Sequence, residues 1–335
     1  MNRVTLRKTI VACALLAAAL LIAIVLMSLL GSERLPVRAS LCALASFGTS
    51  TCGLTQDQFA ILFQIRLPRI LLAAAVGGSL ATAGAGYQAL LRNPLAEPYL
   101  LGISNGAAVG TMIALVFFGT IEWTRPILAF SGALVATFAV YQLARGRAGA
   151  TPERLILAGV IVTTFLSSVI VFVTVMMDAT RIRSFTFWLL GDLSGASRTL
   201  LPVTIVIAIA GALALTLHAR SLNLLMLGER DAFDLGVEVG RVRIVVFLVA
   251  SLLVGSSVAA SGSVGYVGLV VPHLARLSLG SDNRLSIPAA ALGGALFVIV
   301  ADTVARTIIA PRELPVGAIT ALIGAPLFIY LLKRG

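Results

Sequence analysis

Long apolar runs are the feature that most constrains what this chain can fold into. A helix that crosses a bilayer needs about 20 mostly apolar residues, and ten such runs alternate with short polar segments. Hydrophobic residues make up 59% of the 335 and charged residues 12%, against about 45–50% and about 25% in a soluble domain. This composition excludes a water-soluble globule and a disordered chain, and it predicts an all-α polytopic membrane protein. The predicted spans are Thr9–Leu30, Leu67–Leu91, Leu100–Phe118, Ile127–Ala144, Leu155–Met177, Leu200–Leu217, Ile244–Ala260, Val264–Leu279, Leu285–Ile309 and Val316–Leu332.

The positions of the basic residues predict that both termini lie on the cytoplasmic side. Ten spans is an even number, so the two ends share one side of the membrane. With the N terminus inside, 15 of the 25 lysines and arginines fall in inner segments, as the positive-inside rule favours. Docking of an acidic soluble partner and snorkelling at the interface explain the outer basic residues equally well. These residues include Arg66, Arg69, Arg181, Arg183, Arg306 and Arg312.

The net charge of +11 does not indicate a nucleic-acid partner. The arginines stand singly or in pairs between apolar stretches instead of forming one basic face, which is how a membrane protein marks its loops. We therefore expect membrane lipid around this chain and no nucleic acid.

A pattern of small residues occurs twice and predicts two halves of opposite direction. Its copies lie 178 residues apart, in the second and seventh spans, and a separation of five spans inverts one half relative to the other, as in many transporters. Such patterns also recur by chance in membrane helices. We interpret residues 1–335 as a single transmembrane domain with halves of about 1–190 and 191–335. The matching residues are Val76, Gly77, Ser79, Ala81 and Gly84 in one copy, and Val254, Gly255, Ser257, Ala259 and Gly262 in the other.

Two of the three cysteines flank a polar loop that is predicted to lie outside. A disulfide between Cys42 and Cys52 and a pair of free thiols are equally compatible with this position. Cys13 lies within the first apolar run, where it is most simply a small apolar side chain.

The sequence lacks the motifs of catalysis and of metal binding. A P-loop needs G-x-x-x-x-G-K-[ST], and neither Lys8 nor Lys333 has that setting. His218 and His273 stand in different halves, without a cysteine or second histidine at a metal-binding spacing. We therefore predict a chain that is not an enzyme and holds no metal or cofactor, so that any ATP-driven work requires another polypeptide.

Asp302 is the one acidic residue that stands clearly inside a predicted span. Arg306 follows four residues later on the same helix face, so the two side chains can pair and lower the cost of insertion. An ion-coupled transporter usually places unpaired acids near the midplane. A single acid with an arginine partner supports that function only weakly.

The longest predicted inner loop, residues 220–243, has an amphipathic pattern. Two glycines divide it into two short helical pieces, each with apolar side chains among polar ones. The loop is too polar to span a membrane and too apolar to lie idle in water. It predicts a docking element for a cytoplasmic partner, with an interfacial amphipathic helix as the alternative.

Several short motifs follow one another along nearly the whole chain. In the first half they are Arg66-Leu67-Pro68-Arg69, Arg92-Asn93-Pro94-Leu95-Ala96-Glu97-Pro98 and Leu101-Gly102-Ile103-Ser104-Asn105-Gly106-Ala107. In the second half they are Leu227-Gly228-Glu229, Gly262 through Arg276, Ala301-Asp302-x-x-Ala305-Arg306, and Glu313-Leu314-Pro315-Val316-Gly317 through Gly324-Ala325-Pro326. In this order and combination, the chain resembles the permease subunits of bacterial ABC importers for iron–siderophore complexes, heme and vitamin B12, the FecCD-type family.

The resemblance implies a set of partners. The subunit pairs with a second permease copy as a homodimer, and the translocation path lies between the copies. Two cytoplasmic ATPase subunits, which carry the ATP and Mg, bind below, and a periplasmic or lipid-anchored substrate-binding protein docks above. The resemblance also implies the cytoplasmic (inner) membrane of a bacterium.

The resemblance further assigns residues to these contacts. The outer arginines that meet carboxylates of the binding protein match Arg66, Arg69 and Arg306. The coupling element that enters a cleft on the ATPase matches Leu222, Leu225, Met226, Gly228, Glu229, Ala232, Leu235, Gly236 and Val237. We expect a weakly interacting, largely apolar path lined by Leu157, Val160, Thr164 and Ser168, together with Asn93, Pro94, Ser104, Asn105 and Gly106.

The function expected from this resemblance is transport of a metal chelate. A ferric siderophore, heme and cobalamin all remain open as substrates, although Glu97-Pro98 with Ser104-Asn105-Gly106 leans slightly towards vitamin B12. An ion-coupled secondary transporter is the alternative, because inverted repeats occur there too. A channel is a third possibility, since Ser263–Gly268 superficially resembles a carbonyl filter, but it would need a re-entrant loop and a higher-order ring.

Overall fold

A computed structural model describes residues 6–118, 123–146, 149–195 and 200–334, and this part of the chain is almost entirely helical. Seven of its helices are long and apolar enough to cross a membrane. The seven correspond to α1 (Leu6–Leu29), α4 (Leu67–Leu90), α6 (Thr124–Ala144), α7 (Pro152–Met176), α9 (Leu200–Leu217), α12 (Val239–Ser261) and α14 (Asn283–Thr307).

Three shorter apolar helices account for the remaining predicted spans. They are α5 (Ile103–Ile113) with the π-helical turn η3 (Ala114–Phe118), α13 (Val267–Leu279) and α15 (Val316–Arg334). Each of the ten predicted spans therefore coincides with a helix, and the prediction of an all-α polytopic protein is confirmed.

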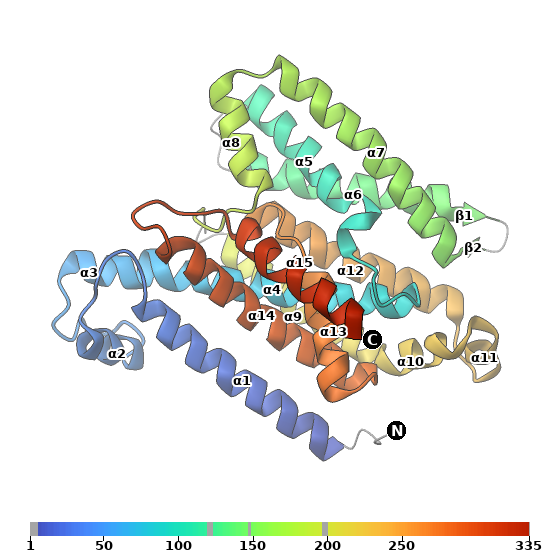
Figure 1. Ribbon diagram of the computed structural model, residues 1–335, viewed down its shortest axis with the longest axis horizontal. Helices are drawn as coiled ribbons and strands as arrows, with labels where there is room; N and C mark the ends of the chain where they lie inside the picture. The colour runs from blue at the N-terminus through green and yellow to red at the C-terminus, as the bar shows by residue number, and fades with distance from the viewer. Residues whose placement is uncertain (1–5, 119–122, 147–148, 196–199, 335) are drawn as a thin grey trace.

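Helix α4 forms the centre of the molecule. It packs against α9, α12, α13 and α14, and most of its residues are buried (Figure 1). Small residues permit this packing, because a Cβ atom at Gly77 would overlap the carbonyl oxygen of Gly294, and one at Gly294 would overlap that of Gly77. Such close backbone approach supplies the van der Waals contact that holds membrane helices together where the hydrophobic effect between them is absent.

Two groups of helices flank this centre. Helices α5, α6 and α7 pack together on one flank, with the short α8 (Ala179–Leu189) beside them, and α1 lies against α14 on the opposite flank (Figure 1). A two-stranded hairpin, β1 (Arg145–Gly146) and β2 (Gly149–Ala150), connects α6 to α7.

The polar segments gather at the two ends of the helices. The start of α1 and the end of α15 lie towards the end that carries α10 (Ala219–Leu227) and α11 (Glu229–Asp234) (Figure 1). At the opposite end lie α2 (Val37–Ala45), α3 (Gln56–Ala60) and the π-helical turn η1 (Ile61–Arg66) (Figure 1). We call these the α10 end and the α2 end. The Cys42–Cys52 disulfide, which the sequence left open, is formed at the α2 end.

The two copies of the small-residue pattern occupy different local settings. Gly84 lies inside α4, whereas Gly262 ends α12 with a φ of +68°, a conformation that glycine adopts at little cost. The inverted relation of the halves stays a prediction.

Candidate functional sites

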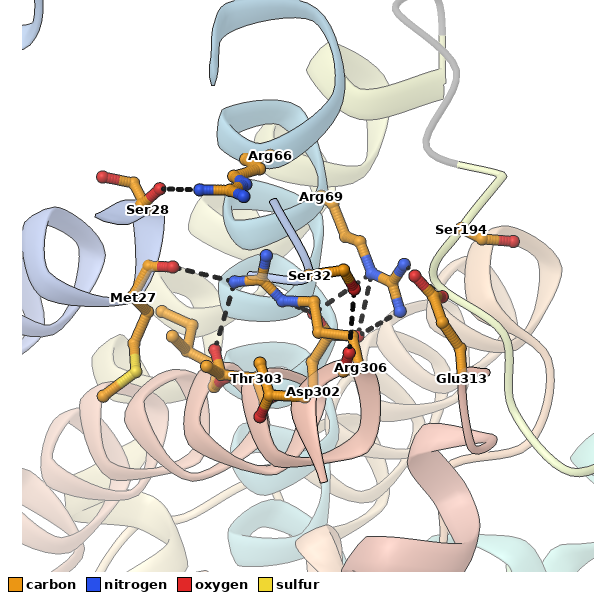
Figure 2. Close-up of polar contacts among 12 residues, drawn as sticks. Met27, Ser28, Ser32, Arg66, Arg69, Ser194, Asp302, Thr303, Arg306 and Glu313 are labelled. Atoms are coloured by element: carbon orange, nitrogen blue, oxygen red, sulfur yellow. Dashed lines mark hydrogen bonds and ion pairs between the residues drawn. The ribbon is translucent and has the colours of Figure 1, made fainter. Parts of the chain in front are cut away.

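A buried cluster of charges lies at the α2 end, between α4 and α14 (Figure 2). The Arg69 guanidinium meets Asp302, with Nη2 2.9 Å from Oδ1 and Nε 3.0 and 3.1 Å from the two carboxylate oxygens. Its Nη1 lies 2.7 Å from Oε2 of Glu313. Arg306 completes the cluster, with Nε 3.6 Å from Oδ2 of Asp302. The predicted Asp302–Arg306 pair is therefore present, but the shortest contacts of Asp302 are with Arg69, 233 residues away.

Arg66 and Arg306 bind the last turn of α1. Arg66 Nη1 donates to the carbonyl oxygens of Ser28 and Leu29, and Arg306 Nη2 donates to that of Met27 at 2.8 Å (Figure 2). The last four carbonyls of a helix lack partners within it, and cations are favoured there by the helix dipole. These two arginines therefore cap α1 and hold it against α4 and α14.

The three arginines predicted to meet a binding protein are thus engaged inside the subunit. Arg66, Arg69 and Arg306 are only 4%, 7% and 4% exposed. Glu313, whose side chain is 43% exposed, is the accessible member of the cluster. A cavity of about 190 Å³ opens beside it and is lined by Arg69, Asp192 and Ser194 as well. The sequence did not indicate Glu313 as a partner of Arg69, because the two residues are 244 positions apart.

The predicted coupling loop forms α10 and α11, which break at Gly228 as the glycine pattern predicts. Four of the nine candidate residues, Leu222, Leu225, Ala232 and Val237, are buried and hold the loop to the rest of the chain. The Glu229 carboxylate lies 2.5 Å from Nη2 of the buried Arg243, so it too faces the subunit. Gly228 is half-buried, and Gly236 is exposed with a φ of +85°.

An apolar surface remains on the outside of this loop. It consists of Met226, Leu227, Phe233 and Leu235, of which Leu227 and Phe233 are 68% and 70% exposed. Met226 and Leu235 were among the predicted coupling residues, whereas Leu227 and Phe233 were not. Because several large apolar side chains exposed within one short loop are typical of an interaction site, we name these four residues the coupling surface.

The coupling loop is clamped to the first turn of α14. Asn223 Nδ2 donates to Oδ1 of Asp282 at 2.7 Å, and Asn223 Oδ1 accepts from both the backbone and the side-chain amide of Asn283, each at 2.9 Å. Hydrogen bonding by the Arg284 side chain lowers the pKa of Asp282 to about 2, so this carboxylate stays charged at neutral pH. We call Asn223, Asp282 and Asn283 the α14 clamp. The sequence does not indicate this clamp, because its two sides are about 60 residues apart along the chain.

One face of α7 carries the four predicted path residues of that helix. Leu157, Val160, Thr164 and Ser168 recur at helical spacing and are all exposed. The Thr164 and Ser168 hydroxyls donate to backbone carbonyls four residues earlier, at 2.9 and 3.1 Å. Their donors are therefore already used, so this face offers a substrate apolar contact and hydroxyl acceptors but no free hydroxyl donor from these two residues.

The remaining path candidates are divided between different settings. Asn105 donates to Thr163 O and Ser167 Oγ and so joins α5 to α7. Gly106 packs against Gly132 of α6, and Ser104 is buried. Asn93 and Pro94 lie in the turn after α4, where Asn93 Oδ1 accepts from the Leu95 amide.

A polytopic helical subunit with an exposed apolar loop at one end and a buried charge cluster at the other belongs to the class of membrane transport subunits. The sequence model that describes the FecCD transport family matches residues 14–334 of this chain. This chain belongs to the FecCD transport family.

Individual relatives agree with this assignment. The chain is 42% identical to the cobalamin import system permease protein BtuC of Halobacterium salinarum, over 84% of this chain and 75% of that protein. It is 41% identical to the hemin transport system permease protein HmuU of Yersinia pestis, over 86% of this chain and 88% of that protein. A solved structure described as a metal-chelate type ABC transporter in an inward-facing conformation matches with a TM-score of 0.83 and 30% identity, covering 98% of this chain and all of that one.

Proposed function

We propose that this chain is the permease subunit of a binding-protein-dependent ABC importer, which moves a metal chelate across the cytoplasmic membrane. The family match over residues 14–334 carries the proposal. Relatives named for cobalamin and hemin transport support a large, planar metal chelate as the substrate class. ATP hydrolysis takes place on a separate subunit, since the chain has no P-loop.

In this proposal the coupling surface contacts the ATPase, and the α10 end is cytoplasmic. Met226, Leu227, Phe233 and Leu235 supply exposed apolar contact, while the buried leucines beneath them keep the loop rigid. Because the loop is rigid, a movement of the ATPase against these apolar side chains displaces the whole loop and does not merely deform it locally.

The α14 clamp then carries this motion towards the outer side. Helix α14 has 25 residues, about 37 Å at 1.5 Å per residue. Its first turn is held by Asn223, and its last two turns contain Asp302 and Arg306. A displacement of the coupling loop is therefore delivered to the charge cluster at the α2 end.

An acidic residue of the binding protein reaches this cluster through Arg69. Glu313 is exposed and occupies Nη1 of Arg69, so an incoming carboxylate can exchange with it in the adjoining cavity. Arg66 and Arg306 reach a partner only by giving up carbonyls of α1, which makes Arg69 the first contact. Charge pairs of this kind contribute mainly to the association rate and to orientation.

The exposed face of α7 lines the path between two copies of the permease. Its hydroxyls are bonded to the helix backbone, and its other side chains are apolar. A wall of this kind holds a chelate weakly, which lets the substrate leave towards the cytoplasm once the binding protein has released it.

Reconstituted uptake tests the proposal and identifies the substrate. The permease is placed in proteoliposomes with the ATPase and binding protein encoded beside it, and cobalamin, heme and a ferric siderophore are offered separately. We expect uptake of one of these classes only when ATP and the binding protein are both present. Uptake of none of them under these conditions would contradict the proposed substrate class.

A further inference from the structure

A second cavity, of about 320 Å³, lies at the α10 end, between the last turn of α4, the end of α10 and α13. It is lined by Gln88, Arg92, Met226, His273 and Arg276, among others. None of the lining residues is acidic. The cavity is separate from the α7 face and from the charge cluster at the α2 end. Met226 of the coupling surface and the path candidate Pro94 also border it, but the transport proposal gives Gln88, Arg92 and Arg276 no role.

Two buried polar atoms beside this cavity lack partners among the described residues. They are Nη2 of Arg276, a donor, and Oε1 of Gln88, an acceptor. Gln88 is only 2% exposed, and its Nε2 is fixed by the carbonyl oxygens of Gly268 and Leu269 at 3.3 Å each. Because only the amide nitrogen of Gln88 can donate to these two carbonyl oxygens, the other atom of the amide group is its oxygen. A buried polar atom without a partner destabilises the fold, so such atoms usually have a bound partner.

The positive charge of Arg276 has no ion-pair partner among the described residues, and that of Arg92 is only partly compensated. The nearest carboxylate to Arg92 is that of Glu229, at 3.9 Å, and Glu229 is already held by Arg243 at 2.5 Å. Arg276 forms no ion pair within the described part of the chain. Two guanidinium groups therefore border one space with no acid between them.

We infer that this cavity binds a phosphate group, with Arg92 and Arg276 as its cationic ligands. The planar guanidinium fork matches phosphate oxygens in two-point contact. Oε1 of Gln88 is left to accept from the hydroxyl of free phosphate or, for a phosphodiester, which has no hydroxyl, from a bound water. The group can come from a phospholipid headgroup or from free phosphate. Basic pockets between helices at the cytoplasmic side of membrane proteins bind lipid headgroups, and the open mouth of this cavity admits either source.

Two measurements on the purified, full-length permease in a neutral detergent separate these sources. Equilibrium binding of radiolabelled inorganic phosphate reports the free anion. Native mass spectrometry reports phospholipid that stays bound after delipidation. The variants are Arg276→Gln and Arg92→Gln, with Arg145→Gln as the matched control. Arg92 is exposed, so Arg92→Gln keeps the fold even if Arg276→Gln does not. Arg145 is an exposed arginine in β1 that does not line the cavity.

Saturable phosphate binding that falls at least tenfold in Arg92→Gln and Arg276→Gln, and not in Arg145→Gln, supports a free-phosphate site. Retained phospholipid that is lost in the same two variants and kept in the control supports a headgroup site. Absence of both ligands from the native permease would overturn the inference. Equal loss in all three variants would also overturn it, because binding would then follow net charge and not this cavity. If an acidic side chain of the ATPase fills this cavity instead, the isolated permease is expected to bind neither phosphate nor phospholipid there.

Discussion

Removal of the Asp302 carboxylate tests whether the buried charge cluster holds the α2 end together. Asp302 is fully buried between Arg69 and Arg306, which are themselves at least nine-tenths buried. The variant Asp302→Ala leaves both guanidiniums without their shared counter-charge. Breaking a buried ion pair by deleting one partner costs about 3–5 kcal/mol, because an uncompensated charge stays in a medium of low dielectric constant.

For Asp302→Ala we expect a loss of stability in the lower part of this range. Arg69 keeps Glu313 at 2.7 Å, and Arg306 keeps the Met27 carbonyl at 2.8 Å, so neither cation is left without a ligand. We expect a loss of about 3 kcal/mol in the free energy of unfolding. At roughly 2 °C per kcal/mol for a chain of this size, the melting temperature falls by about 6 °C.

The assay is thermal unfolding of the purified subunit in detergent. Asp234→Ala is the control, because Asp234 is exposed at the end of α11 and its loss is expected to cost under about 0.5 kcal/mol. Combining Asp302→Ala with Arg69→Met removes a charge from each side, so the double variant is expected to lose less stability than the sum of the two single variants. A melting temperature of Asp302→Ala equal to that of the control, or strict additivity in the double variant, would refute the reasoning.

Four further outcomes follow from the helix packing, the coupling surface and the α14 clamp. Gly77→Ala is expected to cost about 1–3 kcal/mol by overlap with Gly294, whereas Gly265→Ala, in open space, is expected to leave the melting temperature unchanged. Phe233→Asp is expected to abolish co-purification with the ATPase without lowering the melting temperature, since the side chain is 70% exposed; retained co-purification would remove Phe233 from the coupling surface. Asn223→Leu is expected to reduce ATP-driven uptake while ATPase binding persists. Because the pKa of Asp282 is about 2, the stabilisation by its carboxylate is fully present above its ordinary pKa of 3.8 and is lost only as the pH falls through 2. The stability difference between Asn223→Leu and the native chain should therefore stay constant from about pH 5 to pH 8, and a change within that range would contradict the assigned state of Asp282.

The sequence predicts the spans well, because length and apolarity decide whether a segment can cross a bilayer. The break of the coupling loop into two helices was also predictable, since Gly228 adopts a backbone conformation closed to other residues. Patterns of this local kind need no knowledge of the tertiary fold.

Contacts between distant segments could not be predicted in the same way. Nothing around Arg66 or Arg306 indicates that their donors bind the last turn of α1, 37 to 279 residues away. The pairing of Asn223 with Asn283 and that of Arg69 with Glu313 could not be predicted either, because the partners are far apart in the sequence. The arginines were recognisable as unusual, but their partners depend on which helices pack together.

Gly106 shows that a small residue in a membrane helix can be interpreted in two ways from the sequence. Gly106 packs closely against Gly132 of α6, and its predicted place at the translocation path stays a prediction. A small residue in a membrane helix marks either a pathway or a helix crossing, and only the three-dimensional neighbours distinguish the two.

The source of energy for transport tests the central claim most directly. Proteoliposomes that contain the permease, its ATPase and its binding protein are loaded either with ATP or with an imposed proton or sodium gradient, and chelate uptake is measured in the same preparation. We predict uptake with ATP and the binding protein, and none with a gradient alone. Gradient-driven uptake by the permease without its ATPase would contradict the account and would identify an ion-coupled secondary transporter.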